Sequence, residues 1–134
     1  MGTWGPGVFE NDETMDFLWE VEEGGVAALA DAFQQVLAAA GRAESWAEST
    51  AVAAAAIVAA AYDDRDDLLP EEAVALLPTL RPAIVADPAL RDDAMRAVHG
   101  ILIGDSELLE LWRASGESDA AIAAIVDVQS RLSD

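Results

Sequence analysis

Hydrophobic residues recur along the chain with the spacing of an α-helix. The clearest case begins at Val26, where apolar residues fall at i, i+3, i+7, i+10, i+11 and i+14 before Gly41 ends the pattern. The sequence contains no sustained alternation with a period of two, and no Asn-Gly or Asp-Gly hairpin signal. The pattern therefore predicts an all-α fold, a compact bundle of helices joined by short loops.

Capping and stop signals divide this bundle into six or seven helices. Helices are expected over residues 12–23, 26–40, 46–62, 70–78, 88–103, 106–115 and from 118 onward. Pro78 is expected to end the fourth of these, because proline lacks the backbone N–H and clashes with the preceding turn. Residues 78–87, which also contain Pro82, are expected to form an irregular segment or a short helical turn.

The segment from Trp46 to Tyr62 differs from the others because it is rich in alanine and apolar on almost every side. A helix of this kind belongs in the centre of a bundle, where small side chains permit close approach. Ser45 and Glu48 have the spacing of a capping box at its start. The segment is too short for the ~20 apolar residues that span a bilayer, so it predicts a buried helix.

The first ten residues hold three glycines and a proline, too many for a regular element. We expect a loop in which Trp4 and Phe9 anchor the chain by plugging a groove between helices, since each large aromatic side chain buries ~150–250 Å². Asn11 is then expected to cap the first helix, and Trp112 to act as a further structural anchor. The chain is thus expected to form one domain over residues 1–134, with an anchoring loop (1–10) and a helical bundle (11–134).

The charge of the chain is strongly negative. Acidic residues outnumber basic ones 26 to 7, every cation is arginine, and the net charge is -19. Such a surface argues against binding to the phosphate backbone of nucleic acids. The absence of cysteine and of a leader-like segment favours the cytoplasm as the location, without membrane attachment.

Four acidic residues of the first helix, Asp12, Asp16, Glu20 and Glu23, fall within an ~80° arc at about 3.6 residues per turn. Residues 1–41 hold eight acids and no cation. This acidic stripe is either solvated surface or a docking face for a basic protein partner. If the stripe is a docking face, Glu107 and Glu110 of the helix over residues 106–115 are expected to belong to the same surface that contacts the partner.

Other arrangements of reactive residues point to no defined chemistry. The aspartates of residues 63–67 lack the glycine and glutamate that a calcium-binding EF-hand loop requires, so they are interpreted as a solvated linker. His99 is the only histidine and lies opposite the apolar stripe of its helix, on the surface. No nucleophile–base pair is evident, so we expect no enzyme activity, no catalytic residue, no cofactor and no metal.

Two segments carry a resemblance to a known family. Residues 1–12, followed by Asp16 and Phe17, resemble the opening Met-Gly-x-Trp-Gly-x-Gly-x-Phe-x-Asn-Asp of a bacterial domain-of-unknown-function family, number 4259. Residues 105–112 are similar to the Ser-Glu-Leu-x-Glu-Leu-Trp stretch near that family's C-terminal end. The resemblance implies a small helical bacterial cytosolic protein with no established activity.

The leading functional hypothesis is a binding module that recognises a basic protein surface, in the manner of a small immunity or inhibitor protein, as a monomer or homodimer. One alternative is a DNA-mimic protein, whose carboxylates occupy the DNA site of a binding protein. The other is a metal-dependent enzyme that uses clustered carboxylates.

Overall fold

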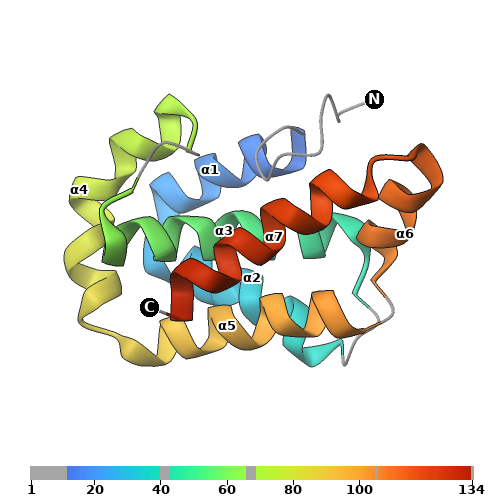
Figure 1. Cartoon of the computed structure of the whole chain (residues 1–134). Coiled ribbons are helices and arrows are strands. Elements are labelled where there is room, and N and C mark those ends of the chain that lie inside the picture. The colour runs from blue at the N-terminus through green and yellow to red at the C-terminus, as the bar shows by residue number, and fades with distance from the viewer. Residues whose placement is uncertain (1–11, 40–42, 66–68, 105, 134) are drawn as a thin grey trace.

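The computed structural model describes residues 12–39, 43–65, 69–104 and 106–133, and every regular element in these ranges is a helix (Figure 1). The all-α prediction is confirmed. The seven helices are α1 (Asp12–Gly24), α2 (Val26–Ala38), α3 (Ser45–Asp63), α4 (Glu71–Val85), α5 (Pro88–Ile103), α6 (Glu107–Ser115) and α7 (Ser118–Ser133). Trp4, Phe9 and Asn11, with the predicted anchoring loop, lie outside the described residues.

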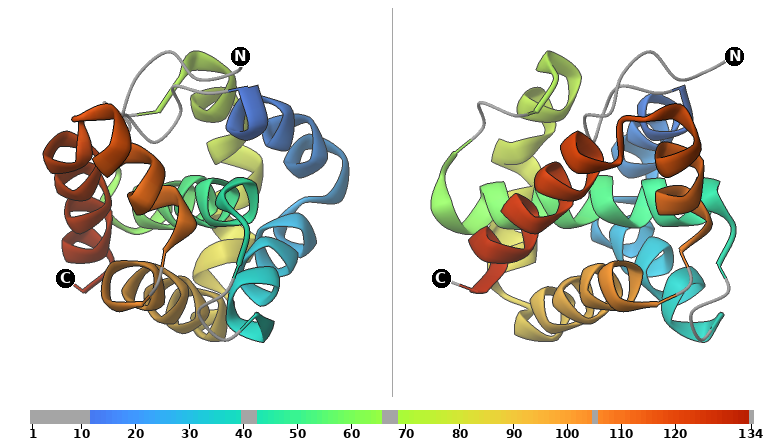
Figure 2. Two further views of the ribbon diagram at one scale, coloured as in Figure 1. Left: turned by 90° about the vertical axis from the view of Figure 1, so that its right-hand side faces the viewer. Right: turned by 45° about the vertical axis from the view of Figure 1, so that its right-hand side comes forward.

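Helix α3 is the centre of the bundle. It contacts each of the other six helices, and every residue from 51 to 61 is buried. Seen end-on, the other helices surround it (Figure 2, left). Alanine makes this possible, because a methyl side chain lets neighbouring helices approach on all sides. The central position predicted for this segment is confirmed.

Helix α4 contradicts the prediction that Pro78 ends it, because it continues through both Pro78 and Pro82 to Val85. Both prolines are exposed and lie on one side of the helix, so the hydrogen bonds that they remove are on the side that water can reach. The opposite side is held by packing against the core. Its buried residues are Ala73, Leu77, Leu80 and Ile84. Tertiary burial therefore outweighs the local helix-breaking effect.

The predicted ends of the helices hold in part. Gly116 ends α6 as expected, with φ 85°. Ser106 was expected inside this helix but is its N-cap, since its Oγ accepts a hydrogen bond from the Leu109 amide at 3.1 Å. The capping box predicted at Ser45 and Glu48 is wrong, because α3 begins at Ser45 itself and its N-cap residue forms no side-chain capping hydrogen bond. Asp87, the N-cap residue of α5, also forms no side-chain capping hydrogen bond.

Among the described residues, no single helix is both long and apolar enough to cross a membrane. Helices α4 and α5 reach the required length and composition only as a pair, and a bend of 107° separates them.

Candidate functional site

The outward side of α1 carries an exposed tryptophan among carboxylates. We call Asp16, Trp19, Glu20 and Glu23 the α1 face; all four side chains are exposed, and Trp19 retains 75% of its accessible surface. At about 100° per residue, Trp19 projects at one edge of this face, about 40° around the helix from Glu23 and about 60° from Asp16. The helix is fixed in this orientation by Phe17, Leu18 and Val21, which are buried on its other side. The side chain of Asp12, the first member of the predicted stripe, lies outside the described part of the structure.

Beside the α1 face, α1 and α4 enclose a small groove with a volume of about 280 Å³. Leu18 is buried at its floor, and the half-buried Met15 and Leu76 extend this apolar surface. The remaining lining residues are the exposed Asp16, Trp19, Glu22 and Glu72. We call this the α1–α4 groove. It combines an apolar floor, one aromatic ring and three carboxyl groups.

The carboxylates of the α1–α4 groove have no cationic neighbour within the described ranges. None of Asp16, Glu22 and Glu72 forms an ion pair or a side-chain hydrogen bond there. The one arginine of α4, Arg81, is directed elsewhere, since it binds Asp64 Oδ1 at 2.9 Å. Among the described residues, the groove therefore presents negative charge that no ion pair neutralises.

Three functional side chains of this site were missed at the level of sequence, Trp19, Glu22 and Glu72. The position of Trp19 follows from the same helical period that aligns the acidic stripe, so a signal for it was present. Glu72 belongs to a helix some fifty residues away along the chain, and no local pattern places it beside α1.

The predicted carboxylates of α6 form a separate group. Glu107 and Glu110 are exposed, but α6 contacts α3 and α7 and makes no contact with α1 in the described residues. An end-on view places α1 and α6 on different sides of α3 (Figure 2, left). Glu107 also has a structural role, because its Oε1 accepts a hydrogen bond from the Ser45 amide at 3.0 Å. The structure thus does not join these residues to the α1 face. Trp112, the fourth predicted anchor, is half-buried on α6.

Glu48 caps α6 from across the bundle instead of capping its own helix. Its side chain is buried, and its Oε1 accepts a hydrogen bond from the Leu108 amide at 3.0 Å. Burial raises the pKa of Glu48, while hydrogen bonds from the Leu108 amide, the Ser106 hydroxyl and the Glu107 amide oppose the rise. Together with the bond from Ser45 to Glu107, this gives a reciprocal exchange in which α3 and α6 each supply a carboxylate to the first turn of the other.

Asp63 belongs to a partly buried ion pair, which corrects its interpretation as part of a solvated linker. Its two carboxylate oxygens accept hydrogen bonds from Arg131 at 2.7 and 3.1 Å, and Arg131 also donates to the Arg65 carbonyl at 2.6 Å. Burial by itself would raise the pKa of Asp63, but the hydrogen bonds from Arg131 and from the Arg65 amide, and the charges of these arginines, hold that pKa below its ordinary value. Arg131 fastens the end of α3 to α7. In the described residues, no three His, Asp or Glu side chains are placed to hold a metal ion.

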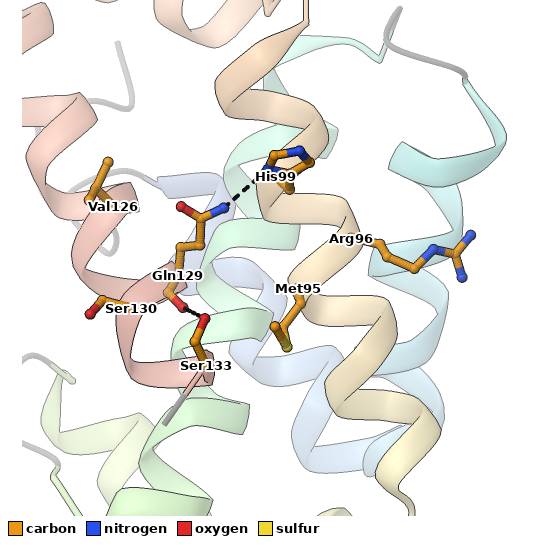
Figure 3. Close-up of a pocket in the computed structure, with 7 residues that line it drawn as sticks. All are labelled: Met95, Arg96, His99, Val126, Gln129, Ser130 and Ser133. Atoms are coloured by element: carbon orange, nitrogen blue, oxygen red, sulfur yellow. Dashed lines mark hydrogen bonds between the residues drawn. The ribbon is translucent and has the colours of Figure 1, made fainter.

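A second groove, of about 360 Å³, lies between α5 and α7 (Figure 3). His99 is exposed there, as predicted, and its Nδ1 lies 3.3 Å from the side-chain nitrogen of Gln129. Ser133 donates to the Gln129 carbonyl at 3.0 Å, while Arg96 extends away from α7 and binds Asp93 at 3.2 Å. His99, Gln129 and Ser133 are therefore engaged with one another, and Arg96 is paired outside the groove.

Comparison with known proteins gives one match. The model of a family described as Domain of unknown function (DUF4259) matches residues 2–124. No curated protein and no solved structure matches the chain.

Proposed function

The chain belongs to the DUF4259 family, and from that premise we propose that it is a small protein-binding module that recognises a basic partner in the manner of an immunity or inhibitor protein. The contact surface is the α1 face together with the α1–α4 groove. The protein acts by covering a positively charged surface of its partner, without a cofactor and without chemistry of its own.

Charge supports this proposal. A net charge of -19 on 134 residues attracts a cationic protein over a distance and opposes association with a second copy of the same chain. The attraction is concentrated at α1, since residues 1–41 contain no cation to compensate their acids. A contact of this kind forms quickly and weakens as salt screens the charges.

The observation that carries the proposal is the exposure of Trp19 within the α1 face. Charged surface alone gives an encounter with little affinity, because exposed ion pairs contribute only about 0–1 kcal/mol each. Tryptophan is among the residues that contribute most to protein interfaces when a partner covers them. Carboxylates around such a ring supply both the attraction and the anchor that a stable contact requires.

Affinity capture from the source lysate, followed by elution with rising salt, tests the proposal. The informative variant is Asp16→Asn/Glu20→Gln/Glu23→Gln, and the matched control removes three exposed charges elsewhere: Asp92→Asn/Glu117→Gln/Asp119→Asn. We expect a basic protein that the wild type and the control retain, that the α1 variant loses, and that salt releases. Equal retention by both variants, or retention indifferent to salt, contradicts the proposal.

A further inference from the structure

We propose that the α1–α4 groove binds an arginine side chain of the partner, with its guanidinium against the ring of Trp19 and its methylene groups along the apolar floor. This inference rests on the proposed function and specifies the residue that the partner inserts.

The size of the groove suits one long side chain. Its volume of about 280 Å³ lies below the roughly 300–1,000 Å³ that is usual for sites of small-molecule ligands. Its floor of Leu18, Met15 and Leu76 is apolar, and long basic side chains bury their methylene stems on such surfaces while keeping the charged end in a polar environment.

The polar groups at the rim suit a guanidinium better than an ammonium. Asp16, Glu22 and Glu72 come from two helices and face the groove from both sides. A guanidinium has five N–H donors in one plane and can bind several carboxylates at once, while the same plane stacks on an aromatic ring. Tryptophan is the strongest of the aromatic rings in cation–π contacts. A lysine ammonium is compact and strongly hydrated, so it uses the ring less well.

Trp46 provides a control within the same molecule. It is also exposed, but it lies in the first turn of α3, and its indole Nε1 donates to Glu44 Oε2 at 2.5 Å. It lines no part of the α1–α4 groove. A cationic peptide attracted only by net charge would approach both tryptophans, whereas an arginine side chain held by the groove perturbs Trp19 selectively.

The test is a titration of the purified, ¹⁵N-labelled full chain with hexa-arginine and, separately, hexa-lysine, two peptides with side chains of equal charge. The readout is the indole N–H resonance of each tryptophan, assigned with Trp19→Leu and Trp46→Leu. We expect hexa-arginine to shift the Trp19 signal with an affinity roughly threefold higher than that of hexa-lysine, as expected for a cation–π contact at an exposed site. Glu22→Gln/Glu72→Gln weakens the response to both peptides.

The preference for arginine must disappear in Trp19→Leu, where the backbone amide resonances of α1 report the two affinities, and it must persist at the Trp19 indole in Trp46→Leu. Circular dichroism confirms that both variants are folded. Equal affinities for the two peptides at Trp19, or a Trp19 signal that stays unchanged while other indole signals move, overturn the arginine assignment. Neither result touches the salt-dependent capture by the α1 face, so the two proposals fail separately.

Discussion

Replacing Asp63 with alanine is expected to destabilise the fold by about 2–3 kcal/mol. The change removes both hydrogen bonds that Arg131 donates to the carboxylate, and the Arg131 side chain keeps only 3% of its accessible surface. Loss of one partner from a fully buried ion pair costs about 3–5 kcal/mol, because the other charge is left buried, while exposed pairs contribute about 0–1 kcal/mol. Since the Asp63 side chain is 21% exposed and Arg131 retains the Arg65 carbonyl, the expected cost lies between these limits.

Urea denaturation followed by far-ultraviolet circular dichroism measures this change, and a double-mutant cycle with Arg131→Met identifies its cause. Methionine fills much of the volume of arginine and brings no charge, so Asp63→Ala/Arg131→Met is expected to be more stable than Asp63→Ala. A loss below about 0.5 kcal/mol in Asp63→Ala, or additive losses in the double variant, would refute the reasoning, since contacting residues are expected to couple by about 0.5–3 kcal/mol.

The pH dependence of the same pair has a defined sign. The pKa of Asp63 is lower in the folded protein than its ordinary 3.8, so the unfolded chain binds more protons as the pH falls. The stabilisation by Asp63 is therefore complete above the ordinary pKa and is lost as the pH falls through the lower folded value. The difference in stability between wild type and Asp63→Ala should shrink over that range, and a difference that grew on acidification would contradict the assigned shift.

Three further predictions concern stability. Glu48→Ala should lower the free energy of unfolding by about 2 kcal/mol, because the first turn of α6 loses charged hydrogen bonds. The pKa of Glu48 is raised from 4.5 in the folded protein, so wild type should lose stability relative to Glu48→Gln as the pH rises from 4.5 through the folded pKa. The opposite pH dependence in urea denaturation would contradict this. Pro78→Ala and Pro82→Ala should each increase the free energy of unfolding by about 1–2 kcal/mol and so raise the melting temperature, because each restores an exposed intrahelical hydrogen bond. An unchanged or lower melting temperature in calorimetry would contradict this prediction. Ala55→Leu should cost about 1–3 kcal/mol in urea denaturation because it overfills the centre of the bundle, and a neutral result would show that α3 has room to spare.

Helical periodicity predicted most of the fold because it depends on neighbours along the chain. The buried α3 and the glycine at the end of α6 both depend on residues a few positions apart. The continuation of α4 through Pro78 and Pro82 could not be predicted in the same way. Local chemistry favours a break there, and the contrary effect comes from four side chains packed against other helices.

The candidate site also combines features that follow from local spacing with features that depend on how the helices pack. The acidic stripe of α1 follows from helical spacing, as does the position of Trp19, although the prediction concerned only the charged residues. Three other features join residues about fifty to seventy positions apart along the chain. They are the place of Glu72 in the α1–α4 groove, the cap that Glu48 supplies to α6, and the ion pair between Asp63 and Arg131. Spacing along a chain carries no information on such pairs until the helices are arranged in space.

All six outer helices pack against α3, so none of them can detach without exposing to water a part of the buried α3 surface next to the contacts of the others. Opening at the periphery is thereby tied to loss of the whole native state, and the amides of α3 should exchange with deuterium only through global unfolding. For the same reason, if the peripheral α1 meets a basic partner as proposed, it does so without transmitting a rearrangement inward, and the protein engages that partner as a preformed, rigid body.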